Sequence, residues 1–200
     1  METIPFKSVG KDCKISPFAR FHNPENIEIG ENVRIDDFGV FSGGSGLKIG
    51  SHIHIACYVS IFAGSGVEIA DFCQLGAYSL LLSESDDFSG HSLIGPQVPS
   101  EYKPGYKKGK IVMERHVTLG AKCTILPGVH MGEGSIAGAC SLISRDCQPW
   151  TLYVGVPARN IKGRSDDMLL LEKQFLKERE ESFLRGRVDS CYDYERDSKI

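Results

Sequence analysis

The sequence predicts an all-β solenoid, a coil in which short strands stack turn upon turn. An apolar residue recurs every 20 residues, at Val9, Ile29, Ile49 and Ile69. Within each interval apolar residues recur every six, as at Ile49, Ile55 and Ile61. The period of six returns without extra residues between Met113 and Ile143. Because six fits neither the 3.6-residue period of a helix nor the alternation of an isolated strand, we predict three flat faces per turn.

The residues at two positions of each hexapeptide are predicted to form the core of such a coil. The first position carries a large apolar residue that we expect to point inward and to stack on its equivalent in the next turn. The fifth position also points inward where the wall bends, and its residues are small, as at Cys73, Ser79 and Val117. The repeats extend over six turns, which exceeds the about three turns that a solenoid needs for stability.

Residues 82–110 interrupt the period and form the first candidate functional segment. This inserted loop is far longer than the ~4–6 residues of an ordinary connection. Three acidic residues, Glu84, Asp86 and Asp87, stand near its start, and His91 follows them. Because loops held by a rigid scaffold often carry binding and catalytic residues, we expect the functional site to involve this loop.

A second change of pattern follows Asp146, where we expect the coil to stop. The β-helix domain is assigned to residues 1–164, a C-terminal helix to residues 165–186 and a charged tail to residues 187–200. The helix is expected to cover the open end of the coil, where strand edges would otherwise be unpaired, with binding of a partner as the alternative. The tail is expected to be poorly ordered.

Composition narrows the class of protein. The chain has 200 residues and a formal net charge of -3, which argues against nucleic-acid binding. No apolar run approaches the ~20 residues of a membrane span, and the amino terminus lacks a signal-peptide pattern, so we expect a cytoplasmic protein. The seven cysteines are an odd number without a Cys-x-x-Cys pair, which predicts free and mostly buried thiols.

The later repeats and the exit from the coil carry a family resemblance. The run from Ile111 to Ala139 resembles the hexapeptide-repeat acyltransferases, and the exit from Val154 to Lys162 is similar to that of their sugar O-acetyltransferase branch. This resemblance implies a left-handed parallel β-helix, which is an exception to the usual right-handed crossover. It also implies a homotrimer that binds acetyl-CoA in the groove between neighbouring subunits, without a metal.

The resemblance also implies a catalytic residue. Acetyl transfer from a thioester requires a base that takes a proton from the attacking hydroxyl or amine, and histidine suits this role. His91, in a Gly-His pair, resembles in position the catalytic histidine of galactoside and xenobiotic acetyltransferases. Asp86, Asp87 or Glu84 is expected to orient its ring, and the sequence does not choose among them. Four other histidines are expected to have structural roles and to face outward from the coil: His52, His54, His116 and His130. His22 lies in the two-residue extension of a coil, where the sequence gives it no partner.

Six residues are expected to bind the cofactor by the same resemblance. The backbone near Ala121 and Ala139 is expected to hold the pantetheine arm. Ser144 and Arg145 align with a Thr-Lys pair that lies beside the cofactor in this family. A further two basic residues align with cations that meet its phosphates: Arg159 and Lys162.

The acceptor site departs from the family pattern. Tyr58 and Gly64 stand where an acceptor-binding Asn and Asp are expected, which argues against a simple galactoside. Tyr58 and the loop residues Tyr102 and Tyr106 are instead expected to contact a larger sugar. The leading hypothesis is an acetyl-CoA-dependent acetyltransferase that modifies a hydroxyl or amino group of a surface-polysaccharide sugar or its nucleotide-linked precursor.

Two other functions remain open from the sequence. One is an antibiotic-modifying O-acetyltransferase of the xenobiotic branch, which shares the coil and the loop histidine. The other is a catalytically silent β-helix scaffold, which would not bind CoA. A metal-dependent form of the scaffold is disfavoured, because no suitably spaced His-x4-His pair is combined with an outward third histidine.

Overall fold

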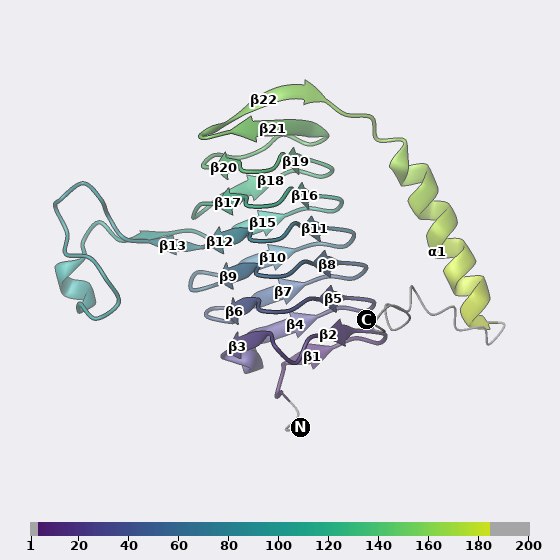
Figure 1. Cartoon of the computed structure of the whole chain (residues 1–200), viewed down its shortest axis with the longest axis horizontal. Coiled ribbons are helices and arrows are strands. Elements are labelled where there is room, and N and C mark those ends of the chain that lie inside the picture. The colour runs from purple at the N-terminus through teal and green to yellow at the C-terminus, as the bar shows by residue number, and fades with distance from the viewer. Residues whose placement is uncertain (1–3, 185–200) are drawn as a thin grey trace, which may run out of the picture. The chain divides into compact units, whose positions relative to one another are not determined.

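The computed structural model describes residues 4–184, and the predicted solenoid of hexapeptide repeats is confirmed. Parallel strands wind around three sides of a coil, so that each side is a sheet (Figure 1). Sheet 1 contains β1 (Ser8–Val9), β4 (Ile27–Ile29), β7 (Leu47–Ile49), β10 (Val67–Ile69), β15 (Ile111–Met113) and β18 (His130–Met131). Sheet 2 contains β2 (Lys14–Ile15), β5 (Arg34–Ile35), β8 (His54–Ile55), β11 (Gln74–Leu75), β16 (Thr118–Leu119), β19 (Ile136–Ala137), β21 (Thr151–Gly155) and β22 (Ala158–Gly163). Sheet 3 contains β3 (Arg20–His22), β6 (Val40–Ser42), β9 (Ser60–Phe62), β12 (Leu80–Leu82), β17 (Thr124–Ile125) and β20 (Leu142–Ile143).

The strand register reproduces the sequence period. Ile29 pairs with Ile49, and Ile49 with Ile69, so each early turn advances by 20 residues. Later turns lack the two extra residues, since Met113 pairs with Met131. Sheets 1 and 3 have six strands each, which makes six complete turns, and β21 begins a seventh in sheet 2. A short 3-10 helix, η1 (Pro24–Asn26), precedes β4.

The interior of the coil is filled by the predicted positions. Phe41, Ile55 and Leu75 are completely or almost completely buried, and each such side chain contributes about 1.5–3 kcal/mol through burial. The small fifth positions are buried as well, for example Cys73 and Ser79. Both positions point inward because the backbone bends at each corner of the prism.

The expected end of the coil after Asp146 is wrong. Cys147 forms a bridge with Met131, and β21 then continues sheet 2 by pairing with β19. Pro149 does not prevent this, because it lies in the turn before β21, where no ladder hydrogen bond is required of it. The chain reverses after Gly155, and β22 returns antiparallel to β21.

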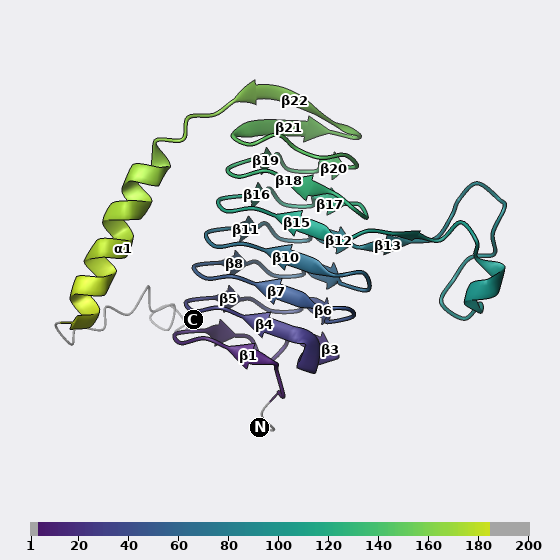
Figure 2. The same ribbon diagram turned by 180° about the vertical axis from the view of Figure 1, so that it is seen from behind.

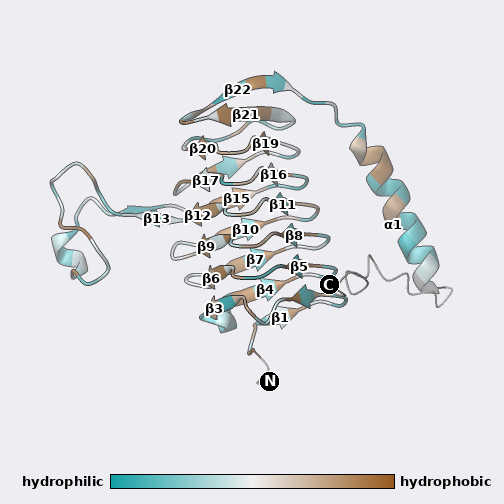
Figure 3. Ribbon diagram, viewed as in Figure 1, coloured by the Kyte–Doolittle hydropathy of each residue, from teal (hydrophilic) through white to brown (hydrophobic). Residues whose placement is uncertain are grey.

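A separate unit begins at Ser165 and contains helix α1 (Met168–Leu184). The helix starts three residues after the expected boundary. The Ser165 hydroxyl accepts a hydrogen bond of 3.1 Å from the N–H of Asp167 just before it. Figure 3 shows hydrophobic residues at the start of the helix, where Leu170 and Leu171 are exposed. The expected helix end at residue 186 and the tail at 187–200 lie outside the described residues.

The inserted loop is an ordered arm. Its stem is a two-stranded antiparallel ribbon of β13 (Glu84–Ser85) and β14 (Lys107–Lys108), and its outer part contains the 3-10 helix η2 (Ser100–Tyr102). The arm leaves the coil between β12 and β15, at the corner that joins sheets 3 and 1. Figures 1 and 2 show it extending away from the coil. This geometry presents the arm's residues at a distance from their own coil.

Candidate active site

Asp87 organises the part of the arm that carries the predicted catalytic histidine. Its carboxylate accepts hydrogen bonds from the N–H of Ser89 at 3.0 Å, the hydroxyl of Ser89 at 2.6 Å and the hydroxyl of Ser92 at 3.3 Å. The hydrogen bonds from Ser89 lower the pKa of the Asp87 carboxyl below its ordinary value. Asp87 therefore acts as a turn-forming carboxylate within the arm.

Asp86 ties the two halves of the outer arm together. One carboxylate oxygen accepts the N–H of Gly95 at 3.1 Å, and the other lies 3.5 Å from the ammonium of Lys103. The same ammonium donates to the carbonyl of Gly95 at 3.1 Å. Only 11% of the Lys103 side chain and 20% of the Asp86 side chain are exposed, so this ion pair is largely shielded from water.

His91 is exposed on this arm. Its backbone N–H donates to the Ser89 hydroxyl at 3.3 Å. Among the arm's described residues, no hydrogen bond joins its ring to Glu84, Asp86 or Asp87, which were expected to orient it. Asp86 and Asp87 are engaged as described above, and Glu84 bonds to Ser65 and Tyr106. The ring of His91 thus has no orienting carboxylate within its own arm.

Three of the predicted binding residues share one corner, between sheets 2 and 3. The ring of Tyr58 stacks on Phe38 at 5.1 Å and on Tyr78 at 4.7 Å. Ala121 and Ala139 lie in the same corner, in later turns of the coil. Hydrogen bonds between successive turns connect them, since the N–H of Lys122 donates to the carbonyl of Ala77 and the N–H of Cys140 donates to the carbonyl of Ala121. Tyr58, which is expected to contact the acceptor, and the backbone at Ala121 and Ala139, which is expected to hold pantetheine, therefore lie along the same corner of the coil.

The remaining cofactor candidates lie elsewhere on the coil. Ser144 and Arg145 are exposed directly after β20, at the opposite edge of sheet 3. Arg159 and Lys162 are exposed on β22, at the end of sheet 2. The structure therefore does not gather all six cofactor candidates into one cluster on a single chain.

The two loop tyrosines have different environments. Tyr102 is exposed in η2. Tyr106 lies in the stem, where its hydroxyl donates to Glu84 at 3.2 Å and its ring lies 4.6 Å beneath the ammonium of Lys103. Burial, and then the negative charge of Glu84, raise the pKa of Tyr106. Tyr106 is thus engaged within the arm, and Tyr102 faces solvent.

Comparison with known proteins identifies the family. No family model matches the chain. The dTDP-4-amino-4,6-dideoxy-D-glucose acyltransferase of Escherichia coli is 41% identical over 176 residues, which cover 88% of this chain and 91% of that protein. The chain belongs to the hexapeptide-repeat acyltransferases. It is therefore an enzyme, and the scaffold hypothesis is wrong.

Solved structures and shorter matches agree with this assignment. AntD, an N-acyltransferase from Bacillus cereus solved in complex with dTDP and 3-hydroxybutyryl-CoA, is 43% identical, with a TM-score of 0.86 over 88% of this chain and 93% of its own. This match confirms the left-handed parallel β-helix. A chloramphenicol acetyltransferase of Klebsiella aerogenes is 35% identical, but the match covers only 34% of this chain and 34% of that protein.

Several histidines outside the arm of the acyltransferase contact other side chains of the coil. His116, which is expected to face outward, is nevertheless covered, since only 3% of it is exposed. Its ring lies between Phe72 at 5.2 Å and Trp150 at 6.2 Å, in a stack at the corner between sheets 1 and 2. Burial lowers the pKa of His116. His54 and His130 each lie beside a carboxylate on the outside of the coil.

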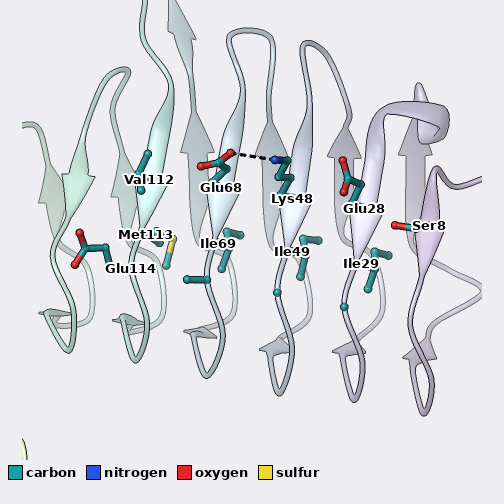
Figure 4. A pocket seen from close by; sticks show the side chains of 13 residues that line it. Ser8, Glu28, Ile29, Lys48, Ile49, Glu68, Ile69, Val112, Met113 and Glu114 are labelled. Carbon is teal, nitrogen blue, oxygen red and sulfur yellow. Dashed lines mark ion pairs between the residues drawn. The ribbon is translucent and has the colours of Figure 1, made fainter.

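A shallow pocket on the outer face of sheet 1 does not contain any of the predicted site residues (Figure 4). Its charged side chains are paired, since Glu68 contacts Lys48 of the lining at 3.5 Å and Lys110 outside the lining at 2.7 Å. Glu28 likewise pairs with Lys7 at 2.8 Å. This ladder neutralises its own charges along the stacked strands, so the pocket is not assigned to catalysis.

Within residues 4–184, no group of three His, Cys, Asp or Glu side chains is arranged to hold a metal ion. In the same part of the chain, no helix combines the length and the hydropathy needed to span a lipid bilayer.

Proposed function

We propose that this acyltransferase moves an acyl group from acyl-CoA to the amino group of a dTDP-linked 4-amino-4,6-dideoxy sugar. The observation that carries the proposal is the match of 88% of the chain to an enzyme named for this acceptor. The complex of AntD with dTDP and 3-hydroxybutyryl-CoA supports both the nucleotide and the thioester as ligands. An amine acceptor resolves the choice between oxygen and nitrogen that the sequence leaves open. Acetyl-CoA and 3-hydroxybutyryl-CoA are the two donors to compare.

His91 is the proposed general base. The neutral sugar amine attacks the thioester carbonyl carbon, and the new C–N bond forms. The C–S bond then breaks, and CoA leaves as the thiolate. His91 takes the proton that the amine nitrogen loses, and the thiol is completed by a proton from His91 or water. A histidine in this role typically supplies ~10²- to 10⁴-fold in rate.

The proposed assembly is a homotrimer with the active site between subunits. The arm's tip exposes three large apolar side chains, with 77% of Phe88, 58% of Leu93 and 54% of Ile94 accessible. Such side chains favour burial against another surface. A neighbouring coil would supply that surface, and it would bring the arm of one subunit toward the corner of the next.

Two chains together also account for the scattered cofactor candidates. On one chain, the edge at Ala121 and Ala139 and the exposed pair Ser144 and Arg145 border sheet 3 from opposite sides. In a groove between two coils, the first edge of one subunit can face the second edge of its neighbour. We retain these four residues, together with Arg159 and Lys162, as proposed acyl-CoA contacts. Tyr58 and Tyr102 are the proposed acceptor contacts.

The proposed setting is the cytoplasm, because acyl-CoA and nucleotide sugars are both intracellular metabolites. The product would be an acylated nucleotide sugar, which suits a later glycosyl transfer into a surface polysaccharide. Tyr106 is proposed to act within the arm and not on the acceptor, since its hydroxyl is already bonded to Glu84.

An acceptor panel tests the function. The protein is incubated with acetyl-CoA or 3-hydroxybutyryl-CoA and with a dTDP-linked 4-amino sugar, the free amino sugar, a galactoside or chloramphenicol, and thiol release is followed. We expect kcat/KM for the nucleotide-linked amine to exceed every other acceptor by at least ~100-fold, because loss of the nucleotide contacts removes several kcal/mol of binding. Equal or faster acylation of chloramphenicol would instead assign the enzyme to the antibiotic-modifying branch.

A further inference from the structure

We infer that Glu84 is a positioning residue that fixes the arm to the coil and thereby sets where His91 stands. The catalytic part of this inference rests on the proposed function, because it takes His91 as the general base. The structural part rests only on the contacts of Glu84.

The Glu84 carboxylate joins three segments of the chain. The hydroxyl of Ser65, in the coil between β9 and β10, donates to one oxygen at 2.7 Å. The hydroxyl of Tyr106, on the returning side of the stem, donates to the other oxygen at 3.2 Å. A side chain on Gly64 would collide with this carboxylate, so glycine at that position leaves room for it. A single side chain therefore links the arm's two sides to the coil below.

The root of the arm is already fixed beside this contact. Ser83 is completely buried, and its N–H and hydroxyl donate to the carbonyl of Phe62 at 3.1 and 2.9 Å. Its hydroxyl also accepts the N–H of Ser65 at 2.9 Å. Where the chain returns, the N–H of Gly109 donates to the carbonyl of Ser83 at 3.0 Å. With the root held, the remaining freedom of a two-stranded ribbon is its tilt, and the contact of Glu84 with Ser65 restrains that tilt.

The restraint continues from the stem to the outer arm. The Tyr106 ring contacts the Lys103 ammonium at 4.6 Å, and this ammonium pairs with Asp86 at 3.5 Å. Asp86 also accepts the N–H of Gly95. The raised pKa of Tyr106 keeps its hydroxyl protonated, as a donor to Glu84 must be. Misplacement of a reacting group by about 1 Å can cost ~100-fold in rate, so the tilt of the arm matters for catalysis.

A carboxylate suits this position because two donors need two acceptors. Glutamine offers one acceptor oxygen, and its amide can meet the second hydroxyl only as a donor, so Glu84→Gln should replace two charge-assisted hydrogen bonds by weaker neutral ones. Glu84→Ala loses both. Gly64→Ala should displace the carboxylate from the opposite side. Glu101→Ala, an exposed glutamate in η2 of the same arm, is the matched control.

Steady-state kinetics tests the catalytic part. We expect Glu84→Ala to lower kcat roughly 10- to 100-fold while KM for acyl-CoA changes less than about 2-fold. Glu84→Gln should fall between Glu84→Ala and the wild type, Gly64→Ala should resemble Glu84→Ala, and Glu101→Ala should resemble the wild type. Unchanged kcat in Glu84→Ala, or an equal loss in Glu101→Ala, would overturn the positioning role.

Hydrogen–deuterium exchange tests the structural part without reference to activity. In Glu84→Ala, amides of residues 86–106 should exchange faster, whereas those of β12 and β15 should keep their protection. Wild-type exchange throughout the arm would overturn the inference. If the wild-type enzyme transfers no acyl group to any acceptor, the proposed function fails, and the exchange experiment still decides whether Glu84 holds the arm.

Discussion

The imidazole Nε2 of His54 lies 2.8 Å from a carboxylate oxygen of Asp36 on the outer face of sheet 2. Arg34 completes the cluster, with its Nε 2.6 Å from the other oxygen of Asp36. Because β5 and β8 belong to successive turns, this cluster ties one turn of the coil to the next. It lies outside the arm and the proposed acyl-CoA contacts, which makes its effect on stability separable from catalysis.

Asp36 gives the first prediction, a pH-dependent stability. Burial would raise its pKa, but hydrogen bonds from His54 and Arg34 outweigh burial and lower the pKa below the ordinary 3.8. A depressed folded-state pKa stabilises the fold above the unfolded-state pKa, and this contribution is lost as the pH falls through the folded-state value. We expect Asp36→Asn to lower Tm near pH 6, with a deficit that shrinks as the pH falls below 3.8.

Thermal unfolding followed by circular dichroism at several pH values measures this difference. Asp166→Asn, at an exposed position in the helical unit, is the control and should show no pH-dependent deficit. A Tm deficit in Asp36→Asn that stays constant from pH 6 to pH 3 would contradict the linkage.

The second prediction concerns His91. His91→Ala and His91→Asn should lower kcat at least ~100-fold, because the base is removed, while the Kd for acyl-CoA stays near the wild-type value. Steady-state kinetics and calorimetric titration measure the two quantities. His22→Ala, at an exposed position of β3, serves as the control. Wild-type turnover in His91→Ala would remove this residue from the mechanism.

The third prediction concerns the cations on β22. Replacing Arg159 and Lys162 together by alanine should raise the Kd for acyl-CoA about 30-fold or more, since each charge-assisted contact to phosphate contributes about 1 kcal/mol or more and about 1.4 kcal/mol is tenfold in Kd. The salt dependence of Kd should weaken in the double variant. Arg20→Ala, at an exposed position of β3, is the control. If the double variant binds acyl-CoA as tightly as the wild type, these residues are not phosphate contacts.

The fourth prediction uses the cysteines as reporters of the proposed pantetheine edge. Cys140 is exposed next to Ala139, whereas burial raises the pKa of Cys73 to about 12. Because the thiolate is the reactive form, iodoacetamide at neutral pH should label Cys140 and leave Cys73 unmodified. Saturating acyl-CoA should slow labelling of Cys140 but not of Cys57, lower in the same corner. Peptide mass spectrometry measures both, and equal labelling of Cys140 with and without acyl-CoA would argue against the assigned edge.

The sequence predicts the coil well because its period is a direct consequence of the fold. Each apolar residue of the repeat stacks on its equivalent one turn away, so the spacing of Ile29, Ile49 and Ile69 predicts the register of the strands. The same logic predicts the small corner residues and the place of the insertion. The prediction that Pro149 ends the coil is wrong, because this proline lies in a corner turn and the hydrogen bonds between strands of successive turns do not involve it.

The contacts of the arm were not predictable in this way. The contacts of Glu84 with Ser65 and of Asp86 with Lys103 join residues that no period relates. His116 occupies an outward position by its hexapeptide, yet the aromatic rings of the adjacent turns cover it. The signal for such a stack is the recurrence of aromatic residues at the 20-residue interval, as at Tyr58 and Tyr78, whose rings stack.

Competition between two acceptors tests whether the enzyme acylates the amino group of a dTDP-linked sugar. Equal concentrations of a dTDP-linked 4-amino-4,6-dideoxy sugar and its 4-hydroxy counterpart are incubated with the enzyme and acyl-CoA in one tube, and the products are identified by mass spectrometry and NMR. We expect a single product, the amide at the sugar nitrogen, formed in equal amount to the CoA released. An ester of the hydroxy sugar as the main product, or no acyl transfer to either sugar, would contradict it.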